Sequence, residues 1–148
     1  MTPPRAYREG KTNFYGYDFT VNRHTLIPRP ETEQLIEKVV EYSTRYLGTN
    51  LRILDVGTGS GVIAIVLKKL LLASVVEATE ISPEALSIAR QNAISNEVEV
   101  TFHEGSLFDS ISGKFDLIVA NLPYVPAARW RYLENQVRDS EPRHAVVA

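Results

Sequence analysis

Residues 51–67, with the sequence LRILDVGTGSGVIAIVL, decide the fold of this chain. Four of the first six residues are apolar, which is typical of a strand buried on both faces of a parallel sheet. Three glycines then alternate with Thr58 and Ser60, and an apolar helical run follows. Glycine permits a tight turn and lets a ligand approach the backbone N–H groups at the start of a helix. The stretch therefore predicts a strand, a ligand-binding turn and a helix, in that order.

The chain after this stretch repeats the alternation of strands and helices. Strand-like runs occupy residues 74–80, 98–103 and 115–120, and helical patterns cover residues 61–72 and 83–96. Ser82 is a suitable cap for the second helix, and Pro83 suits its first position. Strands joined by helices form right-handed crossovers, so we predict an α/β fold with an open, Rossmann-like parallel sheet. Ligands bind at the carboxyl ends of the strands in such sheets.

Two shorter elements precede this core. Residues 13–27 are rich in aromatic and β-branched side chains and contain Gly16 as a turn residue, which predicts a small β-hairpin. Apolar residues then recur at helical spacing over residues 31–47. Pro30 stands directly before this run, where its fixed backbone angle favours the first turn of a helix.

Length and composition indicate one domain. A chain of 148 residues with 44% hydrophobic residues can bury a single core, so we expect an N-terminal segment, 1–30, and a core, 31–148, within one domain. The mixed charges from Ala127 onward predict a solvated helix. Cysteine is absent and the three histidines lack ligand spacing, so no metal is expected. Without a targeting or membrane-spanning pattern, we expect a cytoplasmic protein.

The neighbours of the glycine turn indicate which ligand it holds. Dinucleotide enzymes use a similar turn, but their spacing requires a further glycine where this chain has Val62. Asp55 ends the strand beside the turn, where its charge would repel a pyrophosphate and attract a cation. S-adenosyl-L-methionine carries a sulfonium and an ammonium group, so we predict it as the cofactor. The residues expected to bind it here are Asp55, Gly57, Thr58, Gly59, Ser60 and Gly61.

Two later strand ends add cofactor residues to this prediction. Glu80 closes the second strand about twenty residues after the turn, where this architecture uses an acid to bind ribose hydroxyls. After the third strand, we expect Ser106 near the edge of the adenine ring and Leu107 against its face. The alternative for Glu80 is a solvated carboxylate at a strand end. The alternative for Ser106 and Leu107 is a plain turn without a ligand.

Asn121, Leu122, Pro123 and Tyr124 follow the last strand and form the predicted catalytic loop. The side-chain oxygen of Asn121 and the carbonyl of Leu122 can accept both hydrogens of an NH₂ group and so aim the nitrogen lone pair. Tyr124 can stack on the flat group that carries this nitrogen. An amide nitrogen is a poor nucleophile, so alignment and acceptors that strengthen as positive charge develops are what the protein can supply. We also expect Asn121 to touch the cofactor.

Four segments together carry a resemblance to a known family: residues 28–33 (PRPETE), 55–61 (DVGTGSG), 121–124 (NLPY) and 140–143 (SEPR). From about Tyr7 onward, the chain resembles the protein-(glutamine-N5) methyltransferases that modify peptide chain release factors in translation termination. The resemblance implies a class I methyltransferase core, truncated because family members carry a helical domain before the hairpin and further strands after the Glu-Pro-Arg segment. It also implies that Asn121 and Leu122 hold the glutamine amide of a Gly-Gly-Gln loop in a release factor.

This sequence departs from the family at three positions, and other functions stay open. Leu122 replaces a proline, as in rRNA adenine dimethyltransferases, and Glu80 and Ser106 replace aspartates. The first alternative function is a nucleic-acid amino-methyltransferase acting on adenine or RNA, against which the net charge of −2 argues. The second is a cofactor-binding remnant with little activity. We further expect self-association, because the last strand would expose an apolar sheet edge.

Overall fold

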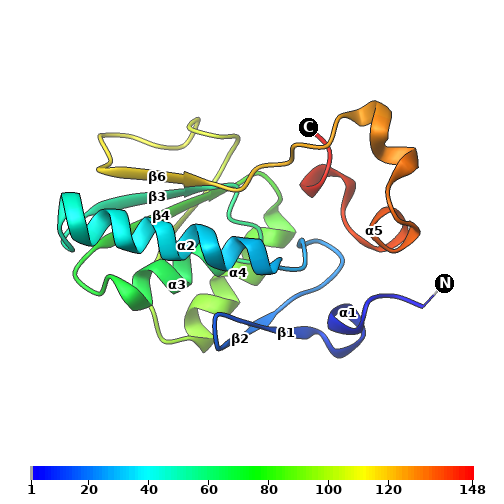
Figure 1. Cartoon of the computed structure of the whole chain (residues 1–148), viewed down its shortest axis with the longest axis horizontal. Coiled ribbons are helices and arrows are strands. Elements are labelled where there is room, and N and C mark those ends of the chain that lie inside the picture. The colour runs from blue at the N-terminus through cyan, green and yellow to red at the C-terminus, as the bar shows by residue number, and fades with distance from the viewer. Residues whose placement is uncertain (1) are drawn as a thin grey trace.

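A parallel four-stranded sheet forms the centre of the molecule, as predicted. The structure is a computed structural model and describes residues 2–148, so Met1 of the expected N-terminal segment lies outside the described residues. The strands are β3 (Arg52–Val56), β4 (Val75–Glu80), β5 (Thr101–Glu104) and β6 (Leu117–Ala120), in the order β5-β4-β3-β6. The carboxyl ends of β3 and β6 therefore lie side by side (Figure 1).

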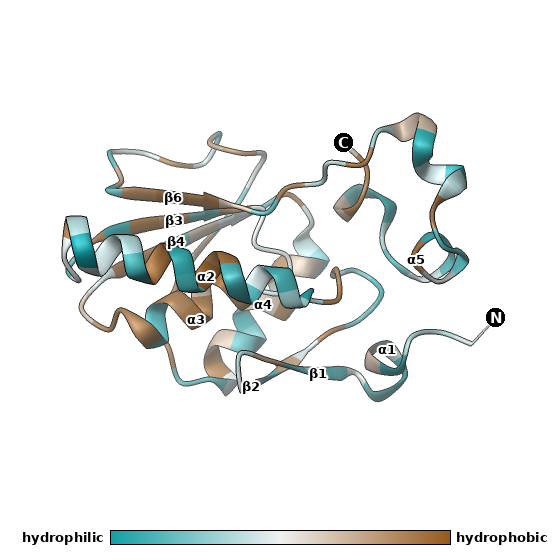
Figure 2. Ribbon diagram, viewed as in Figure 1, coloured by the Kyte–Doolittle hydropathy of each residue, from teal (hydrophilic) through white to brown (hydrophobic). Residues whose placement is uncertain are grey.

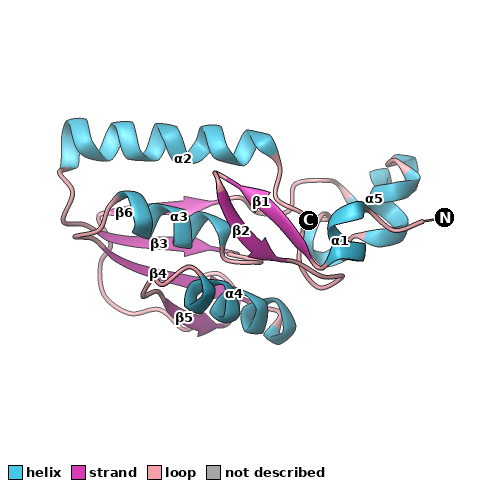
Figure 3. Ribbon diagram, turned by 90° about the horizontal axis from the view of Figure 1, so that it is seen from below, coloured by secondary structure: helices cyan, strands magenta, loops and turns pink. Residues whose placement is uncertain are grey.

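Three helices cover one face of this sheet. They are α2 (Pro30–Tyr42), α3 (Val62–Leu70) and α4 (Pro83–Ser95). In Figure 3, α3 and α4 lie in front of the strands, and α2 lies alongside, next to β6. Many side chains between the two layers are buried and apolar. Figure 2 accordingly shows β6, β3 and α3 largely in brown, the colour of hydrophobic residues. Ile36, Ile53, Ile65 and Val76 belong to this core and are almost completely inaccessible to solvent. The core thus fixes the strand ends against the helices that follow them.

Residues 105–116 connect β5 to β6 without a helix and pass over the other side of the sheet (Figure 1). Arg52 organises this connection, because its guanidinium donates to the carbonyls of Ser112 and Lys114 and lies 4.2 Å from the ring centre of Phe115. The fourth strand was expected to begin at Phe115, but it begins at Leu117. Phe115 stacks on Arg52 instead of pairing with β3.

The remaining boundaries differ from prediction by a few residues. The third strand begins at Thr101 rather than at residue 98, because its pairing with β4 starts at Glu77. The helix over residues 31–47 starts one residue earlier, at Pro30, and its last turn, Ser43–Leu47, is a π-helix. Gly48 closes this wider turn by donating its N–H to the carbonyl of Ser43 at 2.7 Å.

The N-terminal hairpin is shorter than predicted and packs on the core. It consists of β1 (Lys11–Phe14) and β2 (Tyr17–Thr20), preceded by α1 (Arg5–Glu9). Residues 21–27 are not strand, because Asn22 starts a turn in which its side-chain oxygen accepts the N–H of His24. Asn92 of α4, which is fully buried, accepts from the N–H of Thr20 and donates to its carbonyl. These two hydrogen bonds fix the end of the hairpin to α4.

The tail is not the single solvated helix that its charges predicted. It contains 3₁₀ turns at Ala127–Tyr132 and Arg143–Ala145 and a short helix, α5 (Asn135–Ser140). Val147 then forms a parallel bridge with Val125, so the chain returns to the exit of β6. Across residues 2–148, no helix has the length and apolar character needed to cross a membrane. The division of the chain at residue 30 stays a prediction.

Candidate functional site

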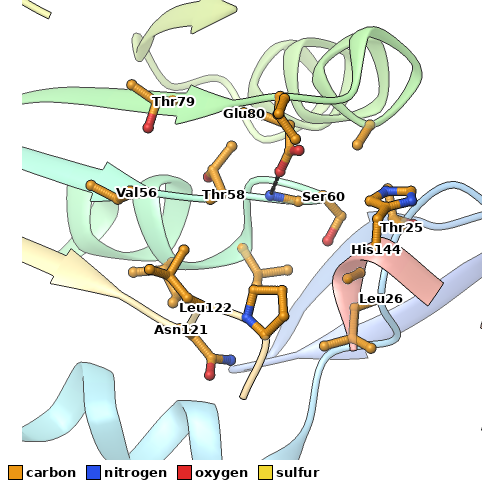
Figure 4. Close-up of a pocket in the computed structure, with 18 of the residues that line it drawn as sticks. Thr25, Leu26, Val56, Thr58, Ser60, Thr79, Glu80, Asn121, Leu122 and His144 are labelled. Carbon is orange, nitrogen blue, oxygen red and sulfur yellow. Dashed lines mark hydrogen bonds between the residues drawn. The ribbon is translucent and has the colours of Figure 1, made fainter. Parts of the chain in front are cut away.

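A cavity at the carboxyl ends of the strands brings together almost all of the predicted site residues (Figure 4). The turn after β3, the end of β4, the start of the β5–β6 connection and the loop after β6 each contribute to its lining. The predicted residues among them are Gly57, Thr58, Gly59, Ser60, Glu80, Ser106, Leu107, Asn121, Leu122 and Pro123. Segments that are distant in sequence thus meet where an open parallel sheet binds its ligand.

The glycine turn is held by β4 and by the packing of two helices. The N–H groups of Gly57 and Thr58 both donate to the carbonyl of Thr79 at 2.9 Å. Gly61, at φ 87°, precedes α3 and lies so close to α4 that an added Cβ would stand 3.3 Å from the Cα of Ala89. Glycine is needed here both for the left-handed backbone and for the close helix contact. The turn is therefore a fixed part of the fold.

Asp55 supports the turn from beneath and does not line the cavity. Its carboxylate is fully buried and accepts hydrogen bonds from the Thr58 hydroxyl at 2.5 Å and the Ala64 N–H at 3.2 Å. Its other oxygen, Oδ1, has no hydrogen-bond partner among residues 2–148. Burial raises the pKa of Asp55 to about 6, and the charge of Glu80 adds to this, while the bonds from Thr58 and Ala64 oppose it. Direct contact of Asp55 with a cofactor stays a prediction.

Asp55→Asn should change how stability depends on pH. Because the pKa is raised from 3.8 to about 6, the folded protein holds a proton that the unfolded chain releases in that window. The contribution of Asp55 to the free energy of unfolding should therefore fall by about 2 kcal/mol as pH rises from 4 to 7, at about 1.36 kcal/mol per pKa unit. In Asp55→Asn this contribution should vanish. Urea unfolding of both proteins at several pH values measures this contribution. If the free energy of unfolding depends on pH in the same way in both proteins, the prediction is wrong.

Glu80 closes β4, as predicted, and its side chain is buried beside the glycine turn. Its Oε2 accepts the N–H of Gly59 at 2.9 Å, and its Oε1 accepts the N–H of Ser82 at 2.9 Å. The Gly59 N–H would be a natural donor to a phosphate, but a carboxylate already occupies it. This arrangement disfavours a pyrophosphate and leaves the remaining lone pairs of Glu80 available to hydroxyl donors.

The predicted adenine side of the cavity gains one residue that sequence reasoning missed. Ile81 follows Glu80 and lines the cavity together with Ser106 and Leu107. Ile81 and Leu107 are exposed apolar side chains, and Leu107 has a φ of 47°, which is uncommon for leucine. Two apolar side chains at the rim suit a flat ring. The sequence could have indicated Ile81, because it directly follows Glu80 at the end of the strand.

The loop after β6 connects this cavity to a second one. Asn121, Leu122 and Pro123 line both cavities, whereas Tyr124, which is 81% exposed, lines only the second. A Cβ on Gly57 would lie 2.8 Å from the Leu122 side chain, so the catalytic loop rests directly on the glycine turn. The Asn121 amide nitrogen lies 3.4 Å from the Thr32 hydroxyl. The two cavities meet at the residues predicted to hold the methyl acceptor.

The remaining walls come from segments that received no role in the sequence-based prediction. Leu26 and Arg29, from the connection into α2, line both cavities, and so do Thr32 of α2 and Ala145 of the tail. His144 lines the first cavity, as does Thr25, and Figure 4 draws both. These wall residues lie within or close to the PRPETE and SEPR segments of the sequence. Both segments carry the family resemblance, but the sequence alone does not place them at the site.

A family model described as the methyltransferase small domain matches residues 32–136. The release factor glutamine methyltransferase of Koribacter versatilis is 46% identical over 145 residues, which cover 97% of this chain and 51% of that protein. The corresponding protein of Flavobacterium psychrophilum is 42% identical over 146 residues, with 97% and 51% covered. The chain thus spans about half the length of these curated relatives.

Solved structures agree with the fold. A ribosomal protein L11 methylase from Lactobacillus delbrueckii subsp. bulgaricus aligns with a TM-score of 0.55 at 35% identity, over 80% of this chain and 59% of that one. A 16S rRNA N2 G1207 methyltransferase from T. thermophilus aligns with a TM-score of 0.62 at 18% identity, over 79% and 33%. The second likeness concerns the fold alone.

Proposed function

Since this chain belongs to the methyltransferase small domain family, we propose that it is the core of an S-adenosylmethionine-dependent N-methyltransferase that methylates a glutamine side chain of a peptide chain release factor. Relatives 40–46% identical over almost the whole chain carry the name release factor glutamine methyltransferase. The observation that carries the proposal is the junction of two cavities at Asn121, Leu122 and Pro123.

The residues of the first cavity suit S-adenosylmethionine better than a dinucleotide. When bound, this cofactor supplies a methyl group on a positively charged sulfur. Glu80 would accept from ribose hydroxyls, and Ile81 and Leu107 would flank the adenine ring. The Gly59 N–H, which is already bonded to Glu80, is not free for a phosphate. The buried Asp55 beneath the turn adds negative charge that favours a cation.

The loop after β6 would hold the acceptor. The Asn121 side-chain oxygen and the Leu122 carbonyl accept the two N–H hydrogens of the amide, and their bonds strengthen as the nitrogen becomes positive. Tyr124 lies exposed at the second cavity, where it can stack on the flat amide group. No strong base is required, because the methylated nitrogen is acidic enough to release its proton afterwards.

A side-by-side assay tests this proposal. A release factor domain with an intact Gly-Gly-Gln loop and an adenine-containing RNA are each offered with labelled S-adenosylmethionine and an excess of the protein. We expect label in the release factor domain and none after its glutamine is replaced by alanine. Label in the RNA alone would favour a nucleic-acid methyltransferase. Cofactor binding without label in either would favour a remnant with little activity.

Self-association is a further prediction, based on the position of β6. It is an outer strand of the sheet, and Ile118 on it is 53% exposed. An unpaired apolar edge tends to pair with another strand. We therefore expect the weight-average mass from light scattering to rise across a concentration series. Ile118→Lys should suppress the rise, and a mass that stays monomeric for the parent would contradict the prediction.

A cytoplasmic location stays a prediction as well.

A further inference from the structure

Two segments that marked the family resemblance, PRPETE and SEPR, meet in space although the proposed chemistry uses neither. Arg29 lies directly before α2, and Glu141 follows α5, 112 residues later. A terminal nitrogen of the Arg29 guanidinium donates to Glu141 Oε1 at 2.5 Å. The side chain of Glu141 is only 3% exposed, whereas that of Arg29 is 40% exposed. This contact is therefore unlike an ordinary surface ion pair.

Arg29 compensates the charge of the buried Glu141 side chain. Within residues 2–148, Arg29 is the only basic group within ion-pair distance of Glu141, and Glu141 Oε2 has no hydrogen-bond partner. Burial raises the pKa of Tyr7, and the charge of Glu141 raises it further while Arg29 opposes it. The neutral Tyr7 hydroxyl donates to the Thr25 carbonyl at 2.6 Å. A buried carboxylate without Arg29 would be left uncompensated, which is strongly unfavourable.

The segment that follows Glu141 forms a wall of both cavities. His144 and Ala145 line the first, and Ala145 and Val146 line the second. The far end of this segment is fixed at the exit of the catalytic loop. There the Val125 N–H donates to the Val146 carbonyl at 3.2 Å, and the Ala148 N–H donates to the Val125 carbonyl at 3.1 Å. Residues 141–148 thus span from Arg29 at one end to Val125 at the other.

We propose that Arg29 and Glu141 form a positioning pair, which holds residues 141–148 as the wall shared by the cofactor and acceptor cavities. The inference rests on the proposed function of these cavities. Arg29 acts here through Glu141 and not on a reacting atom. Cofactor affinity and the protection of the tail therefore depend on the same ion pair.

Arg29→Met tests the pair, because methionine keeps much of the side-chain length and removes the charge. Binding of S-adenosylhomocysteine, measured by calorimetry, should weaken at least about tenfold, the lower end for losing a hydrogen bond to a charged group. Trypsin should also cleave the tail of the folded variant faster, at Arg143 inside residues 141–148 and at Arg138 just before them. Arg29→Lys, which keeps a cation, should restore both properties to within a few-fold of the parent.

Arg5→Met is the matched control. It removes another Arg–Glu pair, Arg5 with Glu9 at 2.6 Å, whose side chains are 80% and 43% exposed. This variant should leave affinity and tail cleavage unchanged.

A purely structural role gives a different pattern. If Arg29→Met melts at a lower temperature but keeps the parent's affinity and tail cleavage where both proteins are folded, the proposal is wrong. If Arg29→Met does not fold, Glu141→Gln, which removes only the charge, should still weaken binding and speed cleavage, and no change in either would overturn the proposal. If the parent binds no S-adenosylhomocysteine, the proposed function fails, while tail cleavage still decides whether the pair holds the wall.

Discussion

Asn121→Ala should reduce methyl transfer at least about 100-fold, which is the loss expected when one preorganised transition-state contact is removed. Cofactor binding should stay within a few-fold of the parent. The reason is the position of Asn121 at the junction of the two cavities, where we expect its amide to serve the acceptor more than the cofactor. Single-turnover assays with the protein in excess over a release factor domain measure the rate, and calorimetry measures binding.

A matched asparagine provides the control for this experiment. Asn50 is exposed, precedes β3 and lines neither cavity, so Asn50→Ala should keep the parent's rate. Thr32→Val is informative as well, because it removes only the hydroxyl that lies 3.4 Å from the Asn121 amide nitrogen. Equal losses of rate and of cofactor affinity in Asn121→Ala would contradict the assigned role. They would make Asn121 a cofactor residue or a structural one.

Glu80→Ala should weaken cofactor binding by about 1 to 3 kcal/mol, the range for losing a hydrogen bond to a charged acceptor. Part of this loss has a cause that the sequence did not reveal. Glu80 also holds the N–H of Gly59, so its removal loosens the turn as well as the predicted ribose contact. Calorimetric titration with S-adenosylhomocysteine measures the effect.

Glu104 is the matched control for Glu80. It closes β5 as Glu80 closes the neighbouring strand, but it is exposed and does not line the cavity. Glu104→Ala should therefore bind as the parent does. If Glu80→Ala and the parent bind equally well, the ribose role of Glu80 is wrong.

The order of strands and helices was predictable because each element carries its own periodicity. An apolar run before a glycine-rich turn indicates a central parallel strand wherever it occurs. The same local reasoning placed Glu80 and Asn121 at strand ends, and the order β5-β4-β3-β6 brought them to one cavity. Gly61 was predictable as a turn residue, but its contact with Ala89 of α4 was not.

The parts that could not be predicted depend on contacts between distant segments. Asp55 was assigned to the cofactor from its charge, but whether a carboxylate faces the cavity or lies beneath the turn depends on how β3 packs against α3. The walls formed by Leu26, Arg29 and Ala145 come from the chain before α2 and from the tail. An ion pair between Arg29 and Glu141 joins these two segments across 112 residues, and such a pair leaves no periodic signal in the sequence.

The most direct test of this account is the ligand preference of the first cavity. Calorimetric titrations of the whole chain with S-adenosylhomocysteine and with NAD under the same conditions measure it. The account predicts measurable binding of S-adenosylhomocysteine, weakened in Glu80→Ala, and no binding of NAD, because Glu80 occupies the Gly59 N–H that a pyrophosphate would need. Binding of NAD, or S-adenosylhomocysteine binding that is indifferent to Glu80, would contradict it.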